Sequence, residues 1–290
     1  MLCVLVGVAF MTLLERKLLS YMQLRKGPNK VSVSGIFQPF SDAMKLFLKE
    51  RLLLKNSNQL LFTLLPVMGL SLGLTLWVLT PSFNVLSFVN SGILLFLCLS
   101  SMNVYIVMGS GWASNSVYSF LGAMRASAQT ISYEISLVFI LLFPCIIAST
   151  INVQSFLETF PAFTLLLFML LLWVVSTLAE TNRAPFDFAE GESELVSGFN
   201  VEYGGGLFAL LFLGEYATIL FFSVFTSACF LSPYSTFVYM LLSLLLAMSY
   251  LFLRGVYPRH RYDKLMQLCW KTILPISMSS LCVGLFLYWI

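Results

Sequence analysis

Long apolar runs separated by short polar stretches dominate the chain and predict membrane-spanning helices. Residues 56–124 contain no Lys, Arg, Asp or Glu, which leaves room for two passes of about 20 residues each. Apolar runs and their proline, glycine and charged interruptions predict helices near residues 1–20, 60–80, 93–111, 127–148, 163–180, 206–229, 236–254 and 270–290. Helices are expected because hydrocarbon offers no hydrogen-bond partners to the backbone. The predicted fold is therefore all-α, a polytopic bundle of about eight transmembrane helices forming a single membrane domain over residues 1–290.

One further helix is predicted to lie along the membrane surface. Within residues 35–50, Ile36, Phe40, Met44 and Phe47 recur at helical spacing, and polar side chains occupy the other positions. The segment is too short and polar to span a bilayer, so an amphipathic interfacial helix fits best, within a basic-side loop over residues 21–59. An ordinary surface helix without lipid contact is the alternative.

Composition and charge agree with this topology. Of the 290 residues, 59% are hydrophobic and 10% are charged, against about 25% charged in soluble domains. Eight passes place all 16 Lys and Arg residues on one side, in or beside the loops 21–59, 112–126, 181–205 and 255–269. The opposite loops carry none, and their only charge is Glu158. The positive-inside rule directs the basic side toward a bacterial cytoplasm or a mitochondrial matrix, and it accounts for the net charge of +3 without nucleic acid as a partner.

The loop over residues 181–205 is unusually acidic for the basic side. From position 180 to 202, Arg183 is the only base among six carboxylates, which are Glu180, Asp187, Glu190, Glu192, Glu194 and Glu202. Like charges held close together raise the pKa of some members, which lets carboxyl groups carry protons near neutral pH. A solvated acidic loop without this role is the alternative.

Two more carboxylates, Glu134 and Glu215, lie inside predicted helices. A carboxylate at membrane depth is costly unless it faces the bundle interior, is protonated or lines a hydrated path. Glu134, Glu180 and Glu215 are therefore predicted to continue the acidic loop into the membrane. The hydroxyl and amide groups of residues 127–133, just before Glu134, can hydrogen-bond between helices or simply pack.

Several motifs resemble those of a known family. They are residues 15–17 (Glu-Arg-Lys), 25–29 (Arg-Lys-Gly-Pro-Asn), 38–43 (Gln-Pro-Phe-Ser-Asp-Ala), 129–134 (Gln-Thr-Ile-Ser-Tyr-Glu), the acidic stretch 179–203 and 259–264 (Arg-His-Arg-Tyr-Asp-Lys). Together they span nearly the whole chain and resemble chain 1 of NADH:ubiquinone oxidoreductase (respiratory complex I) in its mitochondrially encoded form. The long acidic motif is the most specific of them.

The resemblance implies a core membrane subunit that forms the ubiquinone access tunnel and couples quinone reduction to proton translocation. By this resemblance Arg16, Arg25 and Asp42 line the tunnel or its mouth, and Phe212 and Tyr216 contact the quinone. The route toward the proton-pumping subunits would comprise Glu134, Glu180, Arg183, Asp187, Glu190, Glu192, Glu194, Glu202 and Glu215.

The resemblance also implies partners and location. Ubiquinone would be the substrate, with NADH, FMN and iron–sulfur clusters only in partner subunits, so that the chain alone has no catalytic residues. This fits the sequence, which contains no P-loop, G-x-G-x-x-G, H-E-x-x-H or paired CxxC motif and predicts no metal site. Other complex I subunits of the membrane and peripheral arms and membrane lipids are the expected partners, in the mitochondrial inner membrane with basic loops facing the matrix.

Three other functions remain open from the sequence. In an ion-coupled transporter or proton channel, Glu134 and Glu215 would bind the coupling ion without any electron carrier. Related membrane-bound hydrogenase and antiporter complexes use similar membrane subunits. The third possibility is a purely structural membrane anchor.

Overall fold

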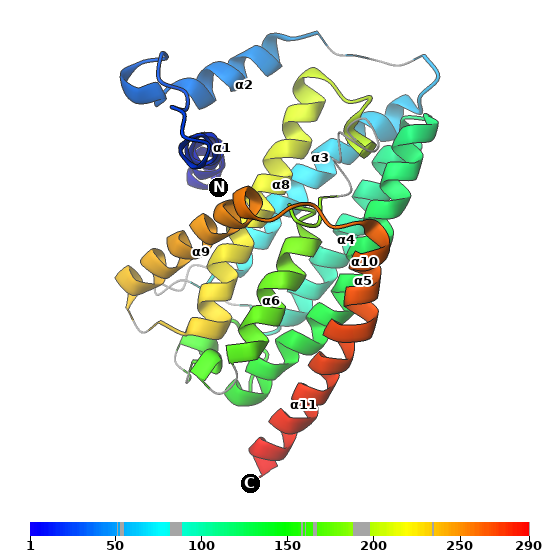
Figure 1. The fold of residues 1–290 in the computed structure, drawn as a ribbon. Helices are drawn as coiled ribbons and strands as arrows, with labels where there is room; N and C mark the ends of the chain where they lie inside the picture. Colours follow the sequence, from blue (N-terminus) through cyan, green and yellow to red (C-terminus); the bar gives the residue numbers. More distant parts are fainter. Residues whose placement is uncertain are drawn as a thin grey trace.

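The computed structural model describes residues 1–50, 52, 55–81, 89–157, 159, 161–164, 167–187, 198–233 and 235–289 (Figure 1). The described chain is built of helices, which confirms the predicted all-α fold. The α-helices are α1 (Leu2–Met22), α2 (Gln38–Leu48), α3 (Gln59–Leu76), α4 (Gly92–Ala113), α5 (Val117–Ala148), α6 (Leu167–Glu180), α8 (Gly205–Thr226), α9 (Thr236–Val256), α10 (Tyr262–Leu268) and α11 (Leu274–Trp289). Two π-helical turns, Ser227–Leu231 and Cys269–Ile273, extend α8 and join α10 to α11.

Six helical stretches within the described ranges are long and apolar enough to cross a membrane. They are Gln59–Leu79, Gly92–Ala113, Val117–Ala148, Gly205–Leu231, Thr236–Val256 and Tyr262–Phe286, and they coincide with six of the eight predicted spans. The other two predicted spans correspond to α1, whose apolar sequence is interrupted by Glu15, Arg16 and Lys17, and to α6, of which 14 residues are described. In Figure 1, α1 is seen nearly along its axis while α3, α5 and α11 run across the view, so α1 crosses the bundle steeply.

Two helices begin earlier than the sequence predicts. The helix predicted from residue 127 begins at Val117, so Arg125 lies inside α5, and the connection from α4 shrinks to residues 114–116. Small residues of the predicted loop are buried on one face of this first part of α5, where Ala123 and Ala126 pack in a hydrophobic cluster with Phe199. The last span likewise begins at Tyr262 rather than at residue 270.

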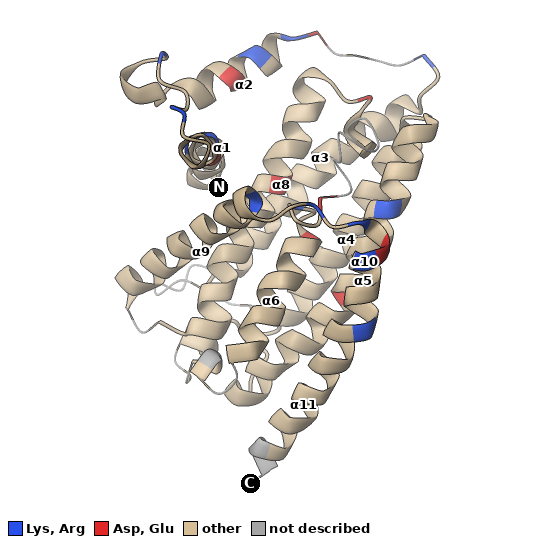
Figure 2. Ribbon diagram, in the orientation of Figure 1, with Lys and Arg blue, Asp and Glu red and all other residues tan. Residues whose placement is uncertain are grey.

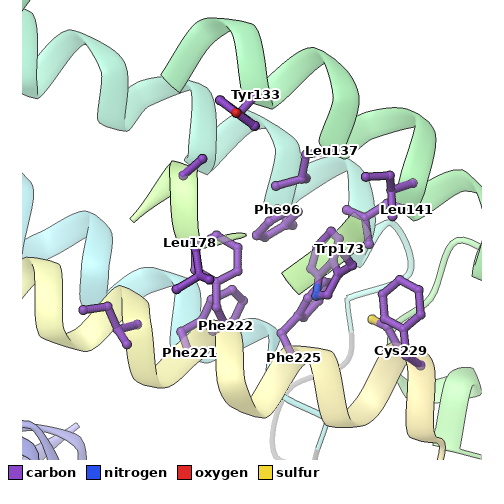
Figure 3. Packing of buried hydrophobic residues seen from close by; sticks show 14 of the residues in the cluster. Phe96, Tyr133, Leu137, Leu141, Trp173, Leu178, Phe221, Phe222, Phe225 and Cys229 are labelled. Carbon is purple, nitrogen blue, oxygen red and sulfur yellow. The ribbon is translucent and has the colours of Figure 1, made fainter. Parts of the chain in front are cut away.

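An aromatic core binds α4, α6 and α8 together (Figure 3). Phe96 of α4 stacks on Phe225 of α8 with ring centroids 4.8 Å apart, and Trp173 of α6 lies 6.1 Å from Phe225. All three side chains are fully buried. Offset and tilted ring contacts of this kind add to the burial of large apolar surfaces, so this cluster holds the bundle together.

Glycines allow α3 and α8 to approach closely. A Cβ atom at Gly214 would lie 3.1 Å from the carbonyl oxygen of Gly69, and one at Gly73 would lie 3.0 Å from that of Gly214. The next two residues of α8 point to different neighbours, because successive residues of an α-helix are rotated by about 100° around its axis. Glu215 lines a cavity shared with α4, and Tyr216 lines one shared with α1.

Helix α2 lies to one side of the bundle, near α1 and α8 (Figure 1). Its predicted apolar residues Ile36, Phe40, Met44 and Phe47 are all exposed in the isolated chain, and the Phe40 ring meets that of Phe10 in α1 edge-on, with centroids 6.1 Å apart. This arrangement suits an interfacial helix, although its contact with lipid stays a prediction.

Charged positions of the described residues lie on α1, α2 and α8, at the end of α9, in the loops at the top of the view and along the side formed by α5, α10 and α11 (Figure 2). The opposite ends of α6, α8 and α9 carry none among the described residues (Figure 2). The polar groups that could carry chemistry therefore lie together, away from the aromatic core.

Candidate functional site

A cavity of about 430 Å³ lies between α1, α2, α8 and α9. Most of its wall is apolar, formed by side chains that include Val8, Leu19, Ala43, Leu46, Phe47, Phe208, Ala209 and Phe212. The polar side chains that line it are Thr12, Glu15, Arg16, Asp42, Tyr216 and Arg254. Small-molecule sites are commonly of this size and kind, mostly apolar with a few placed polar groups.

Glu15 of α1 is the centre of the polar cluster. Its side chain is 3% exposed, and its carboxylate forms ion pairs with Arg254 of α9 and with Arg183, whose Nη1 atom lies 3.3 Å from Oε1. The hydroxyl of Tyr216 in α8 donates a hydrogen bond of 2.6 Å to the other carboxylate oxygen. A buried charge is tolerated only with such partners, so these groups fix one another.

The end of α6 explains how Arg183 reaches this cluster. Asn182 adopts a positive φ of 49°, and its backbone N–H donates to the Ala179 carbonyl while the N–H of Arg183 donates to that of Leu178. This is a Schellman motif with asparagine at the left-handed position. It turns the chain sharply after Glu180 and places the Arg183 guanidinium 4.2 Å above the centre of the Tyr216 ring, a cation–π contact.

Arg16 and Asp42 join α1 to α2 at the edge of the cavity. The Arg16 Nη1 atom lies 2.6 Å from Asp42 Oδ2, and Gln38 donates a hydrogen bond to the other oxygen of Asp42. The two paired side chains remain 50% and 34% exposed, as expected at a cavity mouth. Arg25, predicted for the same place, is exposed, donates to Gln23 and is not among the residues lining the cavity, so its role stays a prediction.

Glu180 lies at a second, smaller polar site. It is 3% exposed, and neither carboxylate oxygen has a hydrogen-bond partner among the described residues. A cavity of about 40 Å³ is lined by Glu180, Asn103, Asn182, Glu215 and Thr218, and another of about 20 Å³ continues from Glu180 to Ser100. A water molecule needs roughly 10–15 Å³ of such space, so both cavities have room for water beside this carboxylate.

The two polar sites are neighbours. A narrow space of about 10 Å³ is lined by Tyr216 and Arg254, which also line the large cavity, by Arg183, and by Thr181, which lines the Glu180 cavity as well. Glu134 of α5, half-buried, lies close enough to interact with both Ser100 and Glu180. Glu134, Glu180 and Glu215 thus lie near one another inside the bundle, and their role in proton transfer stays a prediction.

The remaining residues of the predicted acidic cluster lie in different places. Asp187 is buried and forms an ion pair of 3.4 Å with Arg259, and Glu202 lies half-exposed in the turn before α8. Glu190, Glu192 and Glu194 lie outside the described residues. Arg183, expected as the one base of the acidic loop, contacts Glu15 of α1, because the turn at Asn182 directs it toward that helix.

Tyr203 fixes the far end of the acidic loop. Its ring stacks on that of Phe62 in α3 with centroids 4.2 Å apart. Burial raises the pKa of the Tyr203 phenol above its ordinary value, so the group stays neutral at physiological pH. The residue anchors the entry to α8.

Sequence reasoning missed two charged members of the large site, Glu15 and Arg254. Each is a charge at the edge of an apolar run, which is the signal that could have drawn attention to them. Their pairing could not be foreseen, because they lie at opposite ends of the chain and meet only through the steep crossing of α1.

Comparison with known proteins gives consistent results over almost the whole chain. A family model described as NADH dehydrogenase matches residues 1–285. NADH-ubiquinone oxidoreductase chain 1 of Anopheles gambiae is 51% identical over 294 aligned residues, which cover 99% of this chain and 94% of the relative. The chain 1 proteins of Artemia franciscana and Sarcophilus harrisii are 50% and 48% identical, covering 99% and 95% of this chain and 94% and 90% of their own.

Proposed function

We propose that the large cavity is the passage for ubiquinone, because the chain belongs to the family of NADH-ubiquinone oxidoreductase chain 1. The chain is thus a multi-pass membrane subunit of complex I, and other complex I subunits are its partners. Electrons would come from NADH through FMN and iron–sulfur clusters held by partner subunits. The proposed location is the mitochondrial inner membrane, with the basic loops facing the matrix and lipid around α2.

The observation that carries this proposal is the division of the cavity into an apolar wall and a polar cluster. Ubiquinone has a long hydrocarbon tail and a head with two carbonyl oxygens that accept hydrogen bonds. Phe47, Phe208 and Phe212 offer the tail an apolar surface, while the guanidinium of Arg254 offers N–H donors to the head and the ring of Tyr216 lines the same space. The cavity volume of about 430 Å³ suits a head and part of a tail.

The arrangement also suggests how reduction could reach the acidic groups. Reducing the quinone to quinol takes up two electrons and two protons, so negative charge develops on the head before protonation. That charge would compete with Glu15 for Arg183 and Arg254, which are its ion-pair partners. Arg183 lies in the turn that directly follows Glu180. A shift of its guanidinium would therefore change the electrostatic environment of Glu180 and Glu215.

The remaining predicted residues extend this proposal. Glu134, Glu180 and Glu215 would begin the proton route, with water in the small cavities between them. Arg183 and Asp187 would hold the turn at its start, and Glu190, Glu192, Glu194 and Glu202 would continue the route toward the pumping subunits. Arg16, Arg25 and Asp42 would form the tunnel mouth.

Filling the cavity tests the quinone proposal. Ala43 of α2 lines the cavity, whereas its neighbour Met44 is 59% exposed and does not. In the assembled complex, Ala43→Phe should raise the KM for a short-chain quinone about tenfold, because overfilling a site costs about 1–3 kcal/mol. NADH oxidation by ferricyanide, a water-soluble acceptor, should not change. Met44→Phe is the control, and equal quinone kinetics in the two variants would refute the proposal.

Neutralising Glu180 tests the proton route. Glu180→Gln keeps the shape of the side chain but cannot carry a proton, so proton uptake per electron should fall by half or more in vesicles containing the complex. Glu50→Gln, a change at an exposed carboxylate outside both sites, is the control. An unchanged ratio in Glu180→Gln would remove this residue from the route.

A further inference from the structure

Gln129 of α5 is buried where two parts of the chain meet. Its side chain is 0% exposed, and its amide nitrogen donates two hydrogen bonds of 2.9 Å, to the carbonyl oxygens of Ala179 and Phe186. Both acceptors are backbone carbonyls, so only the NH₂ group of the amide can face them. One side chain therefore holds both ends of residues 179–186.

The segment between these two hydrogen bonds links the two polar sites. It begins beside Glu180, which lines the small cavities, and carries Arg183, which contacts Glu15 and Tyr216 at the large one. Its other supports include a backbone hydrogen bond of 3.0 Å from the N–H of His260 to the Pro185 carbonyl and contacts of the Phe186 ring with Tyr133 and His260. Within this turn a small change in backbone direction moves Glu180 and Arg183 relative to each other.

We propose that Gln129 is a positioning residue, which clamps residues 179–186 so that Arg183 at the quinone cavity and Glu180 at the proton route keep a fixed relation. The inference rests on the proposed function and adds a residue for which the sequence predicts no role beyond hydrogen bonding between helices. The neighbouring Thr130 shows the contrast, because its buried hydroxyl donates only to carbonyls of its own helix, those of Ala126 and Ser127. The side-chain amide of Gln129 instead donates both of its hydrogen bonds to carbonyls at the turn after α6.

Gln129→Met tests the clamp in the assembled complex. Methionine has a similar length and flexibility but no donor, so both carbonyls lose this partner. We expect the complex to assemble, the KM for quinone to rise about tenfold and proton uptake per electron to fall, with ferricyanide reduction unchanged. Thr130→Val, on the next residue of the same helix, should leave all four quantities near wild type.

A double-mutant cycle separates positioning from general support of the fold. If Gln129 acts through Arg183, the effect of Gln129→Met on the quinone KM should largely disappear in an Arg183→Lys background. Additive effects of the two changes would overturn the proposal. Wild-type kinetics and coupling in an assembled Gln129→Met complex would also overturn it.

A second variant covers the case in which Gln129→Met does not assemble. A protonated Glu at this position keeps one donor, so Gln129→Glu should assemble with intermediate effects. Failure of both variants to assemble would assign Gln129 to the fold and overturn the proposal.

The cavity variant separates failure of the clamp from failure of the proposed function. If Ala43→Phe impairs quinone kinetics and Gln129→Met does not, the clamp fails and the proposed function stands. If neither variant impairs them, the proposed function fails as well.

Discussion

The aromatic core and the Glu15 cluster are both buried, but they are held by different forces. In the core, Phe96, Trp173 and Phe225 fill space and bury apolar surface against one another. Another large apolar side chain would fill part of the same volume. In the cluster, the carboxylate of Glu15 depends on particular donors from α8, from α9 and from the turn after α6. The core therefore serves stability, whereas the cluster sets a polar arrangement that a change of charge in the cavity can disturb.

The largest expected effect comes from opening the core. Phe225→Ala removes a fully buried ring and should cost about 3–5 kcal/mol of stability, seen as loss of assembled complex and a lower melting temperature. Phe237→Ala, at a side chain that is 74% exposed, is the control and should assemble normally. If Phe225→Ala assembled normally but lost quinone activity, the division between a structural and a functional region would be wrong.

Neutralising Glu15 should reduce assembly of the complex less than Phe225→Ala does, and it should reduce the quinone reductase activity of the assembled complex more. Removing one partner of a buried ion pair costs about 3–5 kcal/mol, and Glu15→Gln should cost less because its amide oxygen can still accept one hydrogen bond. Arg183 and Arg254 would lose their shared countercharge and leave their positions at the cavity. Quinone reductase activity should fall at least tenfold while ferricyanide reduction persists. Normal quinone kinetics in Glu15→Gln would separate the cluster from the site.

The smallest expected effect is that of Tyr216→Phe. The change removes the hydrogen bond to Glu15 but keeps the ring under Arg183. Glu15 retains both arginines, so we expect a loss of about 1 kcal/mol, seen as a severalfold higher quinone KM with assembly unchanged. A loss as large as that of Glu15→Gln would mean that the hydroxyl itself touches the quinone.

The helices and the intramembrane carboxylates could be predicted from the sequence because both depend on local pattern. The charge-free run of residues 56–124 contains α3 and α4, and the isolated positions of Glu134 and Glu215 signal a polar interior. The partners of each charge could not be predicted. Arg183 is next to acidic residues in sequence but meets Glu15, since the left-handed Asn182 and the steep α1 decide its direction.

The start of α5 shows the same limit on a smaller scale. The sequence predicts a loop over residues 112–126, which include Ser119, Gly122 and Ala123. They are helical because their small side chains are buried against neighbouring segments, which is a tertiary effect. Arg125 consequently lies on a helix rather than in a loop.

Photoaffinity labelling of the assembled complex tests the central claim most directly. A short-chain ubiquinone carrying a photoreactive group on its head would be bound, irradiated and located by mass spectrometry, with and without excess ubiquinone. The account predicts labelling of cavity residues within 8–19, 39–47 and 208–216 that excess ubiquinone suppresses. Labels confined to other parts of this chain, or labels in the cavity that ubiquinone does not displace, would contradict it.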